Sequence, residues 1–207
     1  EQVADYLDFA TDLGVGISNS PGYAYERAED KDHFLSREKT KNLFRDIFKI
    51  GKERGRKWNL SHSSLFLNFL AGNEEYLCTP WGSPTRNVFG WQKPCYLLGE
   101  GYVSSFNELM ETTEWEKYGT GKYQKCSNCM AHCGYEPTAA MDAVKNPLKM
   151  FRIPDMFKIK TEGPMVPEID LSNARPAEDM HEELVATEMS KIEAEKKAAK
   201  ERAEVAA

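Results

Sequence analysis

The sequence has no apolar run near the ~18 residues that a membrane-spanning helix needs. It also lacks a basic excess, because 33 acidic and 27 basic residues give a formal charge of −6. No internal repeat of the length that marks a solenoid is present. These features predict a soluble chain, at most peripheral to a membrane, and they argue against nucleic acid as its main partner.

The chain starts at Glu1 without a targeting segment, that is, without a positively charged start followed by an apolar stretch. Its first residues, with Tyr6, Leu7 and Phe9 followed by Leu13, Val15 and Ile17, have the pattern of a helix that leads into a strand. We therefore expect an upstream portion, and we expect residues 12–18 to form a short buried strand.

Two helices are predicted next. One follows Ser36, carries Leu43, Phe44, Ile47 and Phe48 on a single stripe and stops near Gly51. A shorter one follows the serines at 61, 63 and 64 and stops at Gly72. A strand followed by two helices suits part of an α/β architecture. The basic run from Lys49 to Lys57 is interpreted as a solvated helix end.

The composition changes at Tyr76 to cysteine, glycine, proline and tryptophan, which predicts a loop-rich lobe held by metal. Its one clear helix is opened by a capping box formed by Ser105 and Glu108. The domain prediction is therefore 1–75, 76–150, and an irregular linker and charged tail at 151–207. The tail from about Glu182 is expected to be a solvated helix or disordered.

All five cysteines fall into one pattern of spacing. Cys78 and Cys95 flank Gly90 as C-x11-G-x4-C, and Cys126-x-x-Cys129-x-x-x-Cys133 follows. Two thiolates at C-x-x-C spacing can reach one metal centre, and a hairpin that bends at Gly90 can deliver another pair. An odd number of cysteines without a secretion signal also favours a reducing compartment, where clustered thiols more often hold metal than disulfides.

Three interpretations of this cysteine pattern compete. The thiols can be unrelated buried side chains, since free cysteine is often buried. They can bind structural zinc, for which His132 offers a nitrogen ligand beside Cys133. They can hold a [4Fe–4S] cluster, which suits four or five thiols without a well-placed second histidine. The spacing does not select which four cysteines bind.

The order of the triplet excludes one further use. Radical S-adenosylmethionine (SAM) enzymes hold their SAM-cleaving cluster with C-x-x-x-C-x-x-C, whereas this triplet has the reversed spacing. We therefore do not assign Cys126, Cys129 and Cys133 to a SAM-cleaving cluster, and we expect the chain not to cleave SAM alone.

The cysteine pattern resembles the auxiliary-cluster extensions of the SPASM and twitch kind that follow the partial barrel of many radical SAM enzymes. More closely, five segments resemble the C-terminal half of the hopanoid-biosynthesis radical SAM family, the adenosylhopane synthases, over residues 1 to about 170. These segments are Ser20–Glu26, Cys78–Gly82, Pro84–Gln92, Pro94–Tyr102 and His132–Glu136.

The resemblance implies a C-terminal part of a partial (β/α) barrel followed by a cysteine-rich lobe with an auxiliary [4Fe–4S] cluster at Cys78, Cys95, Cys126, Cys129 and Cys133. The full-length enzyme would use SAM and a second [4Fe–4S] cluster to add the 5′-deoxyadenosyl radical to a hopene, a triterpene. It would take electrons from a flavodoxin or ferredoxin. Its place would be the cytoplasm or the inner face of the membrane.

Other residues receive supporting roles. Gly22, Tyr23, Tyr25 and Glu26 follow the first predicted strand, so they are candidates for the SAM or substrate side of the barrel mouth, although a plain surface turn explains them equally well. Five aromatics are candidates for shielding the cluster or contacting an apolar polycycle, with a simple core role as the alternative: Trp81, Phe89, Trp91, Tyr96 and Tyr102. His132 can tune a cluster by a hydrogen bond or lie at the surface. The rival function is a non-catalytic iron–sulfur or zinc module for electron transfer or structural support. A membrane-associated lipid carrier lacks an amphipathic segment.

Overall fold

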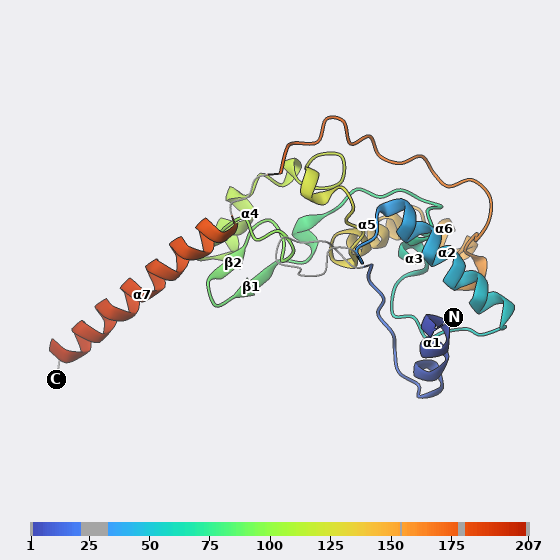
Figure 1. Cartoon of the computed structure of the whole chain (residues 1–207), viewed down its shortest axis with the longest axis horizontal. Helices are drawn as coiled ribbons and strands as arrows, with labels where there is room; N and C mark the ends of the chain where they lie inside the picture. The colour runs from blue at the N-terminus through green and yellow to red at the C-terminus, as the bar shows by residue number, and fades with distance from the viewer. Residues whose placement is uncertain (1, 22–32, 154, 178–180, 206–207) are drawn as a thin grey trace.

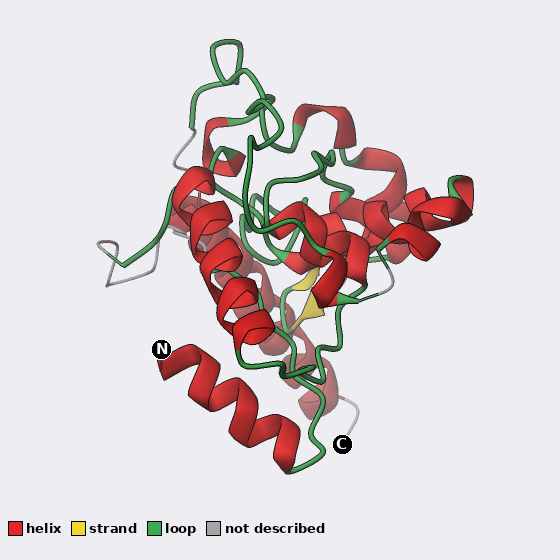
Figure 2. Cartoon of the chain, turned by 90° about the vertical axis from the view of Figure 1, so that its right-hand side faces the viewer, coloured by secondary structure: helices red, strands yellow, loops and turns green. Residues whose placement is uncertain are grey.

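A computed structural model describes residues 2–21, 33–153, 155–177 and 181–205. Helices and loops dominate it, and the described strands form one small sheet (Figure 2). The predicted mixture of helix and sheet is confirmed at that level. Within the described residues, no helix has the length and apolar character needed to cross a membrane.

The N-terminal region contains α1 (Gln2–Asp12), α2 (Arg37–Glu53) and α3 (Ser64–Leu70). Ser36 caps α2 by accepting a hydrogen bond from the Lys39 amide at 3.3 Å. Ser63 caps α3 in the same way from Phe66 at 3.2 Å. The helix α3 ends at Leu70, and Gly72 follows its C-cap with a φ of +70°, the left-handed conformation that glycine adopts without strain. Both predicted helices are therefore confirmed.

The strand predicted at residues 12–18 is wrong except at one residue. α1 extends to Asp12 and is closed by hydrogen bonds from Leu13 to Phe9 and from Val15 to Ala10, with Gly14 at φ +72°. This helix end leaves Leu13 and Val15 exposed. Only Ile17 makes a bridge, parallel to Leu60.

The middle region is built from short elements. It holds the 3₁₀ helices η1 (Pro80–Gly82), η2 (Trp115–Lys117) and η3 (Gln124–Cys126), the helix α4 (Phe106–Thr112) and an antiparallel sheet of β1 (Thr85–Asn87), β2 (Gly90–Gln92) and β3 (Tyr102–Val103). Gly90 pairs with Asn87 across the β1–β2 hairpin at φ +127°, and a Cβ there would lie 2.6 Å from the Val103 carbonyl oxygen. The predicted bend at Gly90 is confirmed, as is the Ser105 cap of α4.

The remaining helices are α5 (His132–Lys145), α6 (Pro147–Arg152), η4 (Met156–Lys158) and α7 (His181–Val205). One hydrophobic core joins α1, α2, α3, α5 and η4, and Figure 1 shows α2, α3, α5 and α6 grouped together while α7 projects away from them. The tail is predicted from the sequence to be either a solvated helix or disordered, and the structure has a helix there, α7.

The segment after η4 is irregular, as predicted, but hydrogen bonds attach it to other parts of the chain. It crosses from α3 to the cysteine region (Figure 1). The Val166 amide donates to the Gly72 carbonyl at 2.9 Å, and Arg175 forms a parallel bridge with Tyr123. This segment therefore ties the helical region to the cysteine region.

Candidate metal centre

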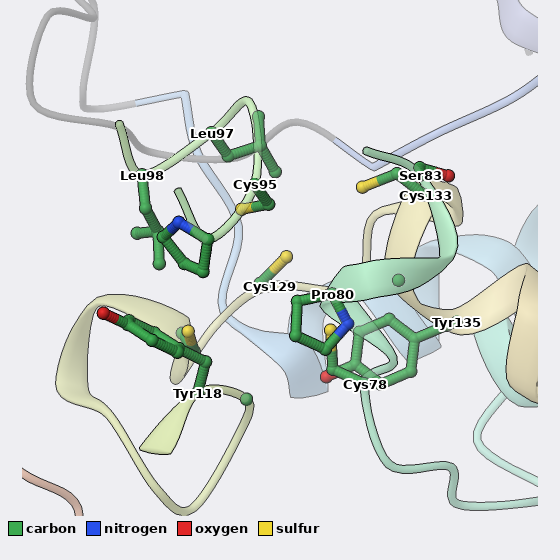
Figure 3. Close-up of a pocket in the computed structure, with 14 residues that line it drawn as sticks. Cys78, Pro80, Ser83, Cys95, Leu97, Leu98, Tyr118, Cys129, Cys133 and Tyr135 are labelled. Atoms are coloured by element: carbon green, nitrogen blue, oxygen red, sulfur yellow. The ribbon is translucent and has the colours of Figure 1, made fainter. Parts of the chain in front are cut away.

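All five cysteines line one pocket, although Cys78 and Cys133 are 55 positions apart in the sequence. Figure 3 shows the sulfur atoms distributed around this space, with Cys129 near its middle. The empty space, including its opening to solvent, is about 510 Å³. Unrelated buried thiols would not be expected to converge in this way from the segment before η1, the connection between β2 and β3, the η3 turn and the start of α5.

The walls of the pocket are apolar. They are formed by proline, leucine and tyrosine side chains with two glycines and one serine: Pro80, Ser83, Pro94, Leu97, Leu98, Tyr118, Gly119, Gly134 and Tyr135. No histidine or carboxylate belongs to the described lining, so its strong metal donors are the cysteine sulfurs, beside the hydroxyls of Ser83, Tyr118 and Tyr135. Such a soft donor set fits an iron–sulfur cluster or a zinc tetrathiolate.

Backbone amides point at four of the five sulfur atoms. Cys95 accepts from Leu97 and Leu98, and Cys129 accepts from Ala131. Cys126 and Cys133 accept from Gly119 and Gly134, respectively. Amide hydrogen bonds to sulfur stabilise thiolates and tune the metal that they bind.

The pKa of Cys78 is raised by burial and by the other four cysteines. Its side chain packs against α5, where a Cβ on Gly134 would collide with the Cys78 Sγ. Glycine is thus needed at position 134 for Cys78 and the first turn of α5 to approach each other. The Thr79 amide fixes the same approach by donating to the Gly134 carbonyl at 2.8 Å.

Burial disfavours the thiolate form of all five cysteines. Burial raises the pKa of Cys95 to about 12 and that of Cys126 to about 11, although amide hydrogen bonds oppose the shift. Burial raises the pKa of Cys78, Cys129 and Cys133 as well, and the neighbouring thiolates add to it for Cys78 and Cys129. A metal cation reverses this balance by replacing the protons.

The geometry of the pocket sets one condition on metal binding. Among the described residues, no three His, Cys, Asp or Glu side chains already stand close enough together to hold a metal ion. The sulfur atoms would therefore have to rotate inward. The cysteine donors, the largely apolar walls and the directed amides nevertheless fit a centre with sulfur ligands.

Buried polar side chains hold the backbone carbonyls of the C-x-x-C turn. Arg37, 4% exposed, donates to the Cys129 carbonyl at 3.0 Å, and Thr120 donates to the Cys126 carbonyl at 3.1 Å. The Thr120 hydroxyl also lies 2.6 Å from the hydroxyl of Tyr135, which lines the pocket. Both carbonyls of the turn are thereby fixed.

The Arg37 guanidinium is balanced by acidic residues. Arg37 pairs with Glu75 at 2.5 Å and with Glu168 at 3.2 Å, and the fully buried Lys41 pairs with the same two carboxylates. Burial opposes the charged form of Arg37, but Tyr135 and the carboxylates outweigh it and raise its pKa. Glu168 belongs to the segment after η4, so that segment completes the support of the turn.

The other predicted site residues lie elsewhere. Gly22, Tyr23, Tyr25 and Glu26 fall outside the described residues. None of the five aromatics predicted to shield a cluster lines the pocket, and Tyr118 and Tyr135 do so instead. Trp81 meets Trp115, Phe89 meets Tyr102, and Trp91 meets Phe106. Tyr96 contacts one of the cysteines, because its hydroxyl is hydrogen-bonded to Cys133.

His132 does not take the position expected of a zinc ligand. It does not line the pocket, and its ring faces His62 at a centroid distance of 5.6 Å. Sequence reasoning missed Arg37, Thr120, Tyr118 and Tyr135, whose roles depend on contacts between distant segments. For Tyr135 alone a signal existed, because it stands two residues after Cys133.

Comparisons with known proteins give one match. A family model described as a domain of unknown function (DUF3463) matches residues 17–153, which include all five cysteines. No curated protein matches, and no solved structure matches.

Proposed function

The chain belongs to the DUF3463 family, and we propose that it is the C-terminal portion of a radical SAM enzyme of the adenosylhopane synthase type, with an auxiliary [4Fe–4S] cluster in its five-cysteine pocket. The observation that carries this proposal is the convergence of five cysteines in a pocket whose described lining has no histidine and no carboxylate. When bound, the cluster would supply electron transfer or structural support to the lobe.

The N-terminal region supports a partial (β/α) barrel as the setting. The segment at Ile17, the helix α2, the segment at Leu60 and the helix α3 follow one another as in a βαβα unit. The bridge between Ile17 and Leu60 is parallel, which a crossover through α2 requires. Further parallel strands from the rest of such a barrel would extend this pair.

In this proposal the chain's own residues hold and insulate the centre. The directed amides and the turn fixed by Arg37 and Thr120 orient the thiolates, while the apolar walls exclude water. The proposed substrates of the full-length enzyme are SAM and a hopene, with a flavodoxin or ferredoxin as electron donor. The proposed location is the cytoplasm or the inner face of the membrane.

The first test measures iron, sulfide and zinc after anaerobic purification and reconstitution. We expect about four irons and four sulfides per chain, lost in a Cys95→Ala, Cys129→Ala double variant. A Ser83→Ala variant is the matched control, because Ser83 lines the same pocket without contributing sulfur. One zinc without sulfide would favour the rival structural module, and no metal would contradict both.

The second test addresses the reaction. The full-length protein, reconstituted with iron and sulfide, is incubated with SAM, a reductant and a hopene, and the lipid extract is examined by mass spectrometry. A product with the mass of hopene plus the 5′-deoxyadenosyl group and one hydrogen supports the proposal. SAM cleavage without such an adduct would point to a radical SAM enzyme with another substrate.

A further inference from the structure

A second polar cluster lies outside the cysteine pocket and contains Ser18, His62, His132 and Glu136. The Ser18 Oγ is 3.1 Å from the His62 Nε2. The His62 Nδ1 is 3.2 Å from the Glu136 Oε2. The other carboxylate oxygen, Oε1, accepts the Ser63 amide at 2.8 Å, which anchors Glu136 at the start of α3.

This cluster lies where ligands bind in many α/β proteins. Ser18 follows Ile17 directly and His62 follows Leu60 by two residues, and Ile17 and Leu60 are partners in the parallel bridge. Both side chains therefore lie at the carboxyl end of the paired segments, the end at which parallel strands present ligand-binding groups. Ser18 is exposed, so a ligand can reach its hydroxyl.

Two buried polar atoms in the cluster lack an aligned hydrogen bond. They are the His132 Nδ1 and the Glu136 Oε2, contributed by residues one helical turn apart on α5. Buried polar atoms are nearly always paired, so an unpaired one calls for a functional or structural reason. The Glu136 Oε2 has the His62 Nδ1 as a neighbour at 3.2 Å, so the His132 Nδ1 is the atom whose hydrogen-bonding capacity the described residues do not fill.

The charges favour one arrangement of protons. Burial alone would raise the pKa of Glu136, but His62 and Ser63 outweigh it and hold the pKa below the usual value. An ionised Glu136 favours the proton of His62 on Nδ1, which faces the carboxylate. The Nε2 lone pair is then directed at the Ser18 hydroxyl, as in the nucleophile, base and carboxylate sets that recur on unrelated folds.

We propose that Ser18, His62 and Glu136 form an acid–base relay that makes the Ser18 hydroxyl a nucleophile toward carboxylic esters. The Ser18 Oγ forms a bond to the ester carbonyl carbon while its proton passes to the His62 Nε2. The ester C–O bond then breaks, and the leaving alcohol oxygen takes that proton from His62. Water next attacks the acyl carbon and gives its proton to the His62 Nε2, and the bond to Ser18 breaks as the Ser18 Oγ takes the proton back and the acid leaves. Glu136 is a positioning residue in this relay. The proposal does not depend on the cysteine pocket.

The test uses a fluorophosphonate, whose phosphorus loses fluoride when a serine attacks it. The chain is incubated with the probe, digested and examined by mass spectrometry for an adduct on Ser18. We expect labelling at Ser18, at least about 100-fold slower in His62→Gln, since general-base catalysis contributes about 10²–10⁴-fold. Glu136→Gln should label more slowly than wild type but faster than His62→Gln. Ser20→Ala is the matched control and should label Ser18 at the wild-type rate.

A second measurement keeps the test valid if a variant fails to fold. In the wild-type chain, the ratio of labelling at Ser18 to labelling at Ser20 should be high in buffer and fall to about one in concentrated urea, where the relay is broken. Equal labelling of the two serines in the folded chain would overturn the proposal. So would a His62→Gln variant that folds, as judged by circular dichroism, and labels Ser18 at the wild-type rate.

Discussion

The helices α3 and α4 have the same length, seven residues, and the same kind of serine cap, but α3 buries all of its residues whereas α4 buries only Leu109. α3 lies within the core shared with α1, α2 and α5. The buried side chains of Leu98, Val103 and Leu109 lie outside that core, whereas Met130 and Tyr135 beside the cysteines belong to it. The comparison indicates that one packed core sustains the helical region, while the sheet and α4, which lie outside it, need cross-links through the thiols.

The largest expected effect is that of removing the metal, which should loosen the cysteine region much more than the helical region. In the Cys95→Ala, Cys129→Ala variant, or after chelation, we expect amide exchange across residues 76–135 to accelerate at least ~100-fold. Exchange in α2 and α3 should change by less than ~10-fold, because their core needs no metal. Hydrogen exchange with mass spectrometry checks this. Equal acceleration in both regions would show that they fold as one unit.

Truncating the helical core should have the next largest effect. Phe48 is 1% exposed in the core, and Phe48→Ala should lower the free energy of unfolding by about 3–5 kcal/mol. Urea unfolding followed by circular dichroism measures this change. Val88→Ala is a suitable control, because Val88 is 85% exposed and should cost less than about 0.5 kcal/mol.

Arg37 joins the two regions, so its loss should damage both. Arg37→Gln leaves Glu75 and Glu168 with one cation fewer, and breaking a buried pair costs about 3–5 kcal/mol. It also removes the hydrogen bond to the Cys129 carbonyl, so we expect less iron per chain after reconstitution.

The matched control for Arg37 is Arg45→Gln. Arg45 is also buried and donates to the Ala71 and Gly163 carbonyls, but its hydrogen bonds do not reach the cysteine turn. Arg45→Gln should therefore lose stability while keeping its iron. If both variants lost iron equally, the role of Arg37 would be limited to general stability.

A smaller effect is expected from acid. Burial would raise the pKa of Glu168, but Lys41 and Arg37 outweigh it and hold the pKa below the usual value. The ionised form therefore stabilises the fold above the ordinary glutamate pKa of about 4.3, and this contribution is lost as the pH falls through the lower folded-state value. The difference in unfolding free energy between wild type and Glu168→Gln should shrink between about pH 5 and pH 3. A constant difference over that range would contradict the assignment.

The smallest effect concerns the ion pairs between α1 and the end of α2. The basic run at Lys49–Lys57 was interpreted as a solvated helix end, but Arg54 and Arg56 pair with Asp5, Asp8 and Asp12 of α1. These partly exposed pairs should each contribute little to the free energy of unfolding, because solvent screens them. Arg54→Ala should show a small loss of stability at low salt, measured by urea unfolding, and the loss should diminish in 1 M salt.

The sequence alone determined the local features of this protein. Serine caps, apolar stripes and glycine stops located α2, α3 and α4 because these signals act over a few residues. The regular spacing identified all five cysteines as one set. The sequence did not exclude a strand at Leu13 and Val15. Apolar residues after a helix give the same pattern whether they form a buried strand or an exposed turn.

Only the tertiary structure decided which side chains surround the cysteines and which support them. Arg37, Thr120, Tyr135 and Glu168 meet around one turn although they come from four separate segments. The Ser18, His62 and Glu136 relay likewise joins three segments. Such sets have no short-range pattern, because their members are brought together by the packing of the whole chain and by the balance of buried charges.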